Sequence, residues 1–247
     1  MSHPLDSAYL KLVRAVEHLE QTEAETQRFV DSNPYVPIID YNFESLEHTL
    51  RVRVLGEPPM HLGLLAGDTI HNLRSALDHL VYQLAALDPD VPRGSKTQYP
   101  IFDEPEKFDA MPTYYLEGVP DRYRALLRVA QPYNPRYALL GPLARLDNRD
   151  KHRIVEPVAA SATMSTLYPD PPDSIYEIQG FDGVVYFEDG AVLGRFHSHG
   201  HVTVDIRDFT YYVRFGPREQ AGLGTDGMRL LVDRIAEILA SFRVAFD

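Results

Sequence analysis

The 247-residue sequence contains no cysteine, few lysines and no long apolar run. The absence of cysteine excludes disulfides, thiolate catalysis and cysteine-ligated metal centres, and it is typical of a reducing compartment. We therefore expect a cytoplasmic protein. The longest apolar runs fall far short of the roughly 18 residues that a membrane span needs, and none follows a basic N-terminus. We expect no membrane segment.

Negative charge dominates the composition, with a formal net charge of -12. Such a balance argues against simple coating of nucleic acid or of an anionic membrane, because the summed field repels phosphate. One segment differs from this average. Residues 121–153 contain eight basic side chains against three acidic ones, and they could hold an RNA backbone.

Several common catalytic and cofactor motifs are also missing, since no Walker A, GxSxG, HExxH or kinase signature occurs. The stretch GLGTDG, residues 222–227, matches GxGxxG, but the chain ends too soon after it for a dinucleotide-binding unit. We expect no cofactor and no bound metal. His197, His199 and His201 could bind a metal from one side of a strand, whereas a hairpin turn at Gly200 would scatter the three rings.

The apolar periodicity predicts a single α+β domain over residues 1–247, built as a helical bundle with two β decorations. A polar loop with little regular structure is expected at 88–120, and the helix in 121–152 is split at QPYNP. The last helix should dock on the helix at 60–88. Helices are predicted at about 5–31, 60–88, 121–152 and 226–246, an N-terminal hairpin at about 36–55, and an antiparallel meander at about 175–216.

Residues 67–85, GDTIHNLRSALDHLVYQLA, combine a leucine-rich stripe with an unusual polar face. Apolar residues recur at steps of three and four, which predicts a helix with one buried face. The other face has no Lys or Glu and carries short, titratable or hydrogen-bonding side chains: Asp68, His71, Asn72, Arg74, Ser75, Asp78, His79 and Tyr82. This composition favours a functional site, although Arg74 and Asp78 also fit an ordinary surface ion pair.

Arg74 and His79 lie on this helix with four residues between them. With its leucine-rich helix, the pair resembles the R-x(4-6)-H motif of the HEPN superfamily, helical bundles that include metal-independent ribonucleases and nucleotide-binding modules. The phrases GDTIHNLRSALDHL and LDNRDKHR are also similar to phrases in a group of uncharacterised bacterial proteins of similar length. The hairpin and the meander lie outside the resemblance, and Ser75 stands where the family usually has a polar residue such as Asn. The same spacing range also fits Arg145 with His152 and Arg195 with His201.

The resemblance implies a metal-independent endoribonuclease of toxin or defence type. His79 would be the general acid or base for attack of a 2′-hydroxyl on phosphorus, and Arg74 would stabilise the charge that develops on the phosphorane. Residues five apart on a helix are splayed by about 140°, so a composite site across a homodimer is expected, as the family implies. The expected partners are RNA or a nucleotide, a second copy of the chain and an antitoxin. Supporting residues come from the same face and from LDNRDKHR: Asp68, His71, Asn72, Ser75, Asp78, Tyr82, Asn148, Asp150, Lys151 and His152.

Two other functions fit the same residues. A non-catalytic module could use the polar face to bind a nucleotide or a protein partner. A metal-dependent hydrolase could use Asp68, His71 and His152, although nothing in the sequence fixes the ligand spacing. The basic residues in LDNRDKHR also suit the partial negative charge at a helix C-terminus. Three tyrosines offer faces on which RNA bases could stack, and they also suit ordinary packing: Tyr114, Tyr115 and Tyr133.

Overall fold

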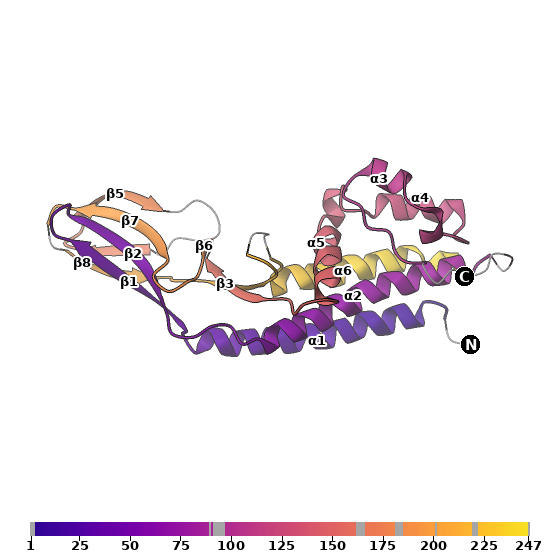
Figure 1. Cartoon of the computed structure of the whole chain (residues 1–247), viewed down its shortest axis with the longest axis horizontal. Helices are drawn as coiled ribbons and strands as arrows, with labels where there is room; N and C mark the ends of the chain where they lie inside the picture. Colours follow the sequence, from indigo (N-terminus) through magenta and orange to yellow (C-terminus); the bar gives the residue numbers. More distant parts are fainter. Residues whose placement is uncertain are drawn as a thin grey trace. The chain divides into compact units, whose positions relative to one another are not determined.

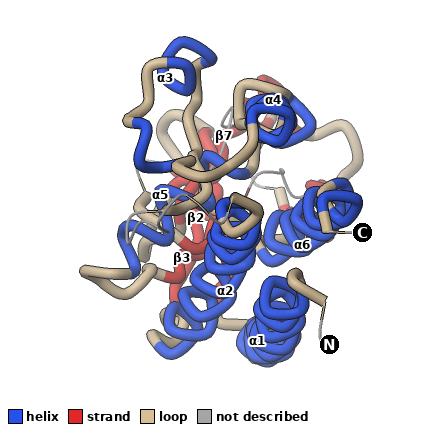
Figure 2. Tube along the Cα trace, turned by 90° about the vertical axis from the view of Figure 1, so that its right-hand side faces the viewer, coloured by secondary structure: helices blue, strands red, loops and turns tan. Residues whose placement is uncertain are grey.

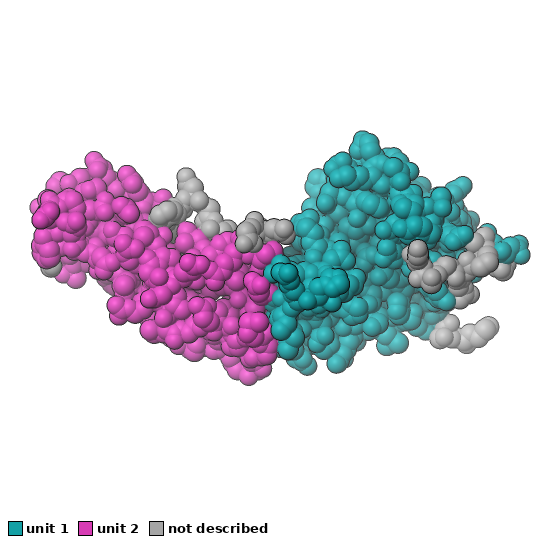
Figure 3. All heavy atoms as spheres, viewed as in Figure 1, with its two compact units in different colours: residues 1–24, 63–155, 222–247 teal, residues 25–62, 156–221 magenta. Residues whose placement is uncertain are grey.

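The computed structural model describes residues 3–88, 90, 97–161, 166–180, 185–200, 202–218 and 222–246. The chain divides into two compact units, where the sequence predicted one domain. A helical unit contains residues 1–24, 63–155 and 222–247, and a β unit contains residues 25–62 and 156–221 (Figure 3). Each unit is assembled from segments that are distant in the sequence.

Three long helices form the core of the helical unit, and they lie side by side in both ribbon views (Figures 1 and 2). They are α1 (Asp6–Asp31), which continues into the β unit, α2 (His61–Ala85) and α6 (Thr225–Ser241). Most residues of their apolar stripes are buried: Leu12, Leu19, Ile70, Leu73, Leu77, Leu80, Leu84, Leu231, Ile235 and Ile238. Full burial of one such side chain contributes roughly 1.5–3 kcal/mol, so this stripe fixes α2 firmly. The HEPN-like identity of the bundle stays a prediction.

The segment between α2 and β3 (Pro157–Ser161) contains short helical elements. As predicted, the helical part at 121–152 is split at QPYNP, where Asn134 Oδ1 accepts the backbone N–H of Arg136 at 3.1 Å. The segment expected as a loop at 88–120 holds only two single-turn helices in its described part. The elements are α3 (Pro105–Asp109), η1 (Thr113–Tyr115), α4 (Asp121–Val129), η2 (Pro135–Tyr137) and α5 (Leu140–Asp150), and a further turn, η3 (Arg243–Ala245), follows α6.

Every strand pairing in the described part of the β unit is antiparallel, as expected. The predicted hairpin is present as β1 (Tyr35–Asn42) and β2 (Glu47–Val54), with Tyr35 opposite Val54 and Asn42 opposite Glu47. The sheets have the orders β1-β2-β7-β5, β6-β3-β9 and β4-β8. The other strands are β3 (Pro157–Ser161), β4 (Thr166–Asp170), β5 (Ile175–Gly180), β6 (Val185–Tyr186), β7 (Val192–Ser198), β8 (Thr203–Arg207) and β9 (Tyr212–Phe215).

The predicted meander is wrong in its topology. Strand β7 pairs with β2 of the hairpin and with β5, so hairpin and later strands share one sheet, and strands already begin before residue 175. Packing between distant segments decides this order. Tyr35 of β1 lies edge-on to Phe187 and Tyr211, with ring centroids 5.0 and 4.9 Å apart, in a cluster with the buried Val52. Turn signals and alternation define strands but not the partner of each strand.

None of the helices in the described ranges combines the length and the apolar character that crossing a membrane requires.

Candidate functional site

Arg74 and Asp78 on α2 form the predicted ion pair, and both hold the backbone of Tyr99. Arg74 Nη2 lies 3.0 Å from Asp78 Oδ1 and donates to the carbonyl oxygen of Tyr99 at 2.7 Å. Asp78 Oδ1 accepts the N–H of the same tyrosine at 2.8 Å. Burial raises the pKa of the Asp78 carboxyl, and Arg74 and the Tyr99 N–H oppose the rise. The pair therefore has a clear structural function.

The segment that follows Tyr99 is fixed on its other side by residues after α4. The fully buried Tyr99 hydroxyl donates to Ala130 O at 2.7 Å, and burial raises its pKa. The buried Gln131 donates from Nε2 to Pro100 O at 2.9 Å and accepts the N–H of Phe102 at 3.0 Å. A buried backbone group needs such a partner, so these bonds give residues 99–102 a single conformation.

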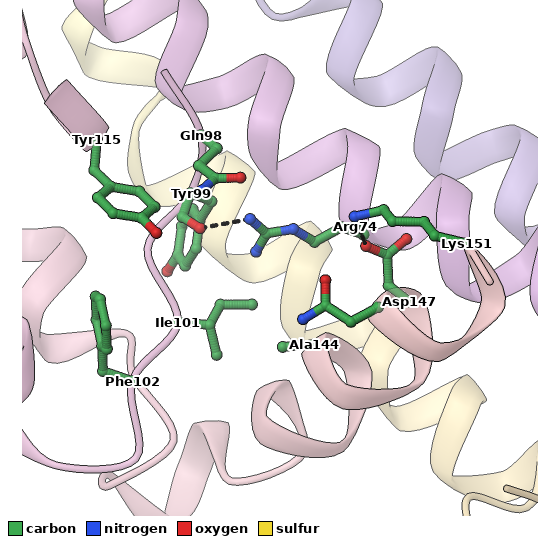
Figure 4. Close-up of a pocket in the computed structure, with 10 residues that line it drawn as sticks. Arg74, Gln98, Tyr99, Ile101, Phe102, Tyr115, Ala144, Asp147 and Lys151 are labelled. Carbon is green, nitrogen blue, oxygen red and sulfur yellow. Dashed lines mark hydrogen bonds and ion pairs between the residues drawn. The ribbon is translucent and has the colours of Figure 1, made fainter. Parts of the chain in front are cut away.

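A pocket of about 220 Å³ lies between this segment, α2 and α5 (Figure 4). At about 30 Å³ for each water molecule, it has room for about seven. Arg74 projects from α2 toward the segment at 98–102, and Asp147 and Lys151 come from the end of α5. The lining residues are Arg74, Gln98, Tyr99, Ile101, Phe102, Tyr115, Ala144, Asp147, Asn148 and Lys151.

The cationic part of the pocket has one donor without a partner. Arg74 Nη1 is buried and has no hydrogen bond within the described chain, although Nη2 of the same guanidinium has two acceptors. An unsatisfied buried donor costs about 1–3 kcal/mol. An acceptor oxygen brought to this end of the pocket would therefore be favoured.

The end of α5 packs against the polar face of α2 through Asp147, whose side chain is only 2% exposed. Its Oδ2 lies 2.8 Å from Lys151 Nζ, and its Oδ1 lies 3.3 Å from His71 Nδ1. On the other side of the imidazole ring, His71 Nε2 lies 3.5 Å from Ser75 Oγ. The segment LDNRDKHR thus joins the face that contains Arg74, and it does so mainly through a residue that the sequence did not single out.

Asp150 faces α2 one turn further along. A Cβ atom on Gly67 would overlap the Asp150 carboxylate, so glycine is what lets the two helices approach here. Burial, Asp68 and Asp147 raise the pKa of the Asp150 carboxyl, and His71 opposes them. Asp150 and Asp68 therefore surround the imidazole without lining the pocket.

Other predicted site residues lie apart from the pocket. His79 is half-buried, does not line the pocket and makes no hydrogen bond or ion pair with Arg74. Asn72 faces α1, where its Oδ1 accepts from Lys11 Nζ at 3.4 Å. Tyr82 and His152 are exposed. Within one chain, the structure does not bring the two predicted catalytic residues together.

Of the three histidine candidates for a metal site, the structure describes His197 and His199. No group of three or more His, Asp or Glu side chains is placed to hold a metal ion in the described ranges. His197 and His199 both stack on Tyr176, with centroid distances of 5.8 and 4.6 Å, and His201 lies outside the described residues.

Several lining residues could not be recognised in the sequence. Gln98, Ile101 and Phe102 belong to the segment expected as a loop, where no periodicity indicates which side chain faces inward. Tyr115 lies in the same segment and was named in the sequence only as a tyrosine that offers a stacking face. Asp147 did carry a signal, because it is an acidic residue within the apolar repeat of a helix. A buried carboxylate almost always has a partner.

Comparisons of the chain with protein-family models, with curated proteins and with solved structures find no match.

Proposed function

We propose that the helical unit is a binding module for a small anionic ligand of the phosphorylated-metabolite class, such as a nucleotide, whose anionic part occupies the Arg74 pocket. The observation that carries the proposal is a preformed pocket lined by Arg74, whose guanidinium has a buried Nη1 without an acceptor in the described chain. A phosphate or carboxylate oxygen would supply it, and hydrogen bonds from a guanidinium to such an anion are strong.

The charge balance supports a ligand of low charge. Each cation of the pocket already has one carboxylate partner, Asp78 for Arg74 and Asp147 for Lys151. The field in the pocket is therefore weak, and affinity depends on local donors: Arg74 Nη1, the Lys151 ammonium and the side-chain amides of Gln98 and Asn148.

The size of the pocket limits how much of a ligand can enter. Sites for drug-sized ligands usually measure about 300–1,000 Å³, more than the 220 Å³ found here. The aromatic rings of Phe102 and Tyr115 line the same pocket. They offer stacking surfaces to a planar group attached to the bound anion.

Thermal unfolding with adenosine monophosphate, adenosine and inorganic phosphate tests this function. Ligands that carry phosphate should raise the melting temperature in a concentration-dependent manner, by an amount that corresponds to about 2.7 kcal/mol at 100 times Kd, and adenosine should not. Lys151→Met and Asn148→Ala should remove the shift, measured against each variant's own melting temperature. Lys107→Met is the matched control, because Lys107 is an exposed lysine paired with Glu104 on α3. No shift with either phosphate compound, or a shift that survives both pocket variants, would overturn the proposal.

The endoribonuclease expected from the sequence stays a prediction. It needs a base beside the Arg74 guanidinium, and within one chain His79 does not take that place.

A further inference from the structure

Ser75, His71 and Asp147 form a linear chain of polar contacts at the junction of α2 and α5. The imidazole ring lies between a buried carboxylate, 3.3 Å from Nδ1, and a serine hydroxyl, 3.5 Å from Nε2. Ser75 and His71 are four residues apart on α2, so the helix itself places them on one face. The order of the three groups is that of a nucleophile, a general base and an orienting carboxylate.

The partners of Asp147 determine the tautomer of the imidazole. The Lys151 ammonium can only donate, so the Asp147 carboxylate accepts from it at 2.8 Å and is free to accept also from Nδ1 of His71. With its proton on Nδ1, the neutral ring has its lone pair on Nε2, facing the Ser75 hydroxyl. The contact between Ser75 and His71 is long, as such contacts often are before a substrate binds.

Access and charge around the ring suit proton transfer. The His71 side chain is 54% exposed, whereas Asp147 is 2% exposed, so the base is open to a substrate and its orienting group is protected from water. The groups that face or surround the imidazole are Asp68 and Ser75 from α2, and Asp147, Asp150 and Lys151 from the end of α5.

The geometry points to Ser75 as the nucleophile of a serine hydrolase centre for carboxylic esters, with His71 as its base and Asp147 as a positioning residue. Ser75 Oγ attacks the carbonyl carbon as its proton passes to His71 Nε2. The ester C–O bond then breaks, and the same proton goes to the leaving alkoxide, so an acyl-Ser75 remains. Water attacks the acyl carbon, gives a proton to Nε2, and the acid leaves as that proton returns to Ser75 Oγ.

This centre does not depend on the binding function proposed for the pocket. Asp147 is the one residue of the three that also lines the pocket. Thermal shift with phosphate and labelling of Ser75 are both measured on the wild-type chain, so the two proposals can fail separately.

A fluorophosphonate probe on the full chain tests the inference, because its phosphorus forms a covalent bond with an activated serine as fluoride leaves. Peptide mapping should find the label on Ser75, and p-nitrophenyl acetate should be hydrolysed with a loss in Ser75→Ala. His71→Ala should slow labelling by about 10²-fold or more, the usual contribution of a general base. Ser241→Ala is the matched control, since this serine on α6 donates to Ile238 O and has no histidine partner.

The Asp147→Asn variant tests whether Asp147 orients the His71 ring or only stabilises the fold. It should slow labelling and alter its pH profile, because the His71 ring loses the carboxylate that orients it, and a merely structural role would leave the profile unchanged. Melting temperatures of all variants show that they are folded. Absence of label on Ser75 in the folded wild-type chain, or equal labelling in His71→Ala, would overturn the proposal.

Discussion

The carboxylate of Asp78 accepts the backbone N–H of Tyr99 at 2.8 Å, and the carbonyl of the same tyrosine is held by Arg74 at 2.7 Å. One i,i+4 pair on α2 thus satisfies both backbone polar groups of a fully buried residue in an otherwise irregular segment. The sequence left two interpretations of Arg74 and Asp78, a functional site or an ion pair, and in the structure the ion pair lies beside a pocket. The pair fixes one wall of the pocket, and Nη1 of its guanidinium is buried without a hydrogen-bond partner in the described chain.

Arg74→Ala should destabilise the fold, because it leaves the Tyr99 carbonyl and the Asp78 carboxylate without their charged partner. Hydrogen bonds that involve charged groups contribute about 1.5–3 kcal/mol, so we expect a loss of about 2 kcal/mol in the free energy of unfolding. Urea denaturation measures it. Arg14→Ala is the control: its pair with Glu17 is exposed, and its loss should cost less than about 1 kcal/mol. Equal losses in the two variants would contradict this structural function of Arg74.

The sequence predicted the helices well and the strand partners poorly, for one physical reason. The stripe from Ile70 to Leu84 is local information, since burial of one helix face imposes a repeat that can be read within a single segment. The pairing of β7 with β2 joins residues about 145 positions apart, and no local pattern specifies such a partner.

The dependence on local patterns also explains which residues of the pocket could be predicted from the sequence. Arg74, Asn148 and Lys151 were predicted because unusual polar residues stand out on an amphipathic helix. Tyr99 acquires its position from contacts with α2 and with Ala130, and the backbone N–H of Gln98 donates to the carbonyl oxygen of Tyr115. No periodic signal exists in a loop that is held in this way.

Gly63→Ala should destabilise the protein, although alanine normally favours a helix by about 1 kcal/mol over glycine. A Cβ atom at this position of α2 would overlap the backbone carbonyl oxygen of Val155, which cannot rotate away. Overpacking of this kind costs roughly 1–3 kcal/mol. Gly227→Ala on α6 is the matched control, since its Cβ would meet only the end of the flexible Leu223 side chain. Chemical denaturation should show a clear loss for the first variant and a change below about 0.5 kcal/mol for the second.

Asp150→Asn should stabilise the protein at neutral pH. Folding raises the pKa of this carboxyl, so the carboxyl binds its proton more tightly in the folded chain than in the unfolded chain. The free energy of unfolding therefore falls as pH rises above the ordinary pKa of about 3.8. The asparagine removes this charge and leaves the shape of the side chain almost unchanged. We expect a gain of a few tenths of a kcal/mol at pH 7, because solvent screens a partly exposed group, and no gain below about pH 4.

Denaturation at several pH values measures this difference, with Asp233→Asn at an exposed position of α6 as the control. A gain that is independent of pH, or one shared by the control, would show that the raised pKa of Asp150 has no effect on stability.

RNA cleavage is the direct test of the HEPN-type function that the sequence predicts. A HEPN-type reaction needs His79 as acid or base and Arg74 against the phosphorane, yet Arg74 Nη2 is occupied by Asp78 and Tyr99, and His79 lies outside the pocket. We therefore expect that wild type and His79→Ala behave alike when incubated with a mixed RNA pool in EDTA and analysed for cut ends. Cleavage by the wild type alone, with cyclic phosphate ends, would instead require a second chain to bring His79 and Arg74 together. The wild type should then lose activity on dilution below its dimerisation constant, whereas a site contained in one chain would not.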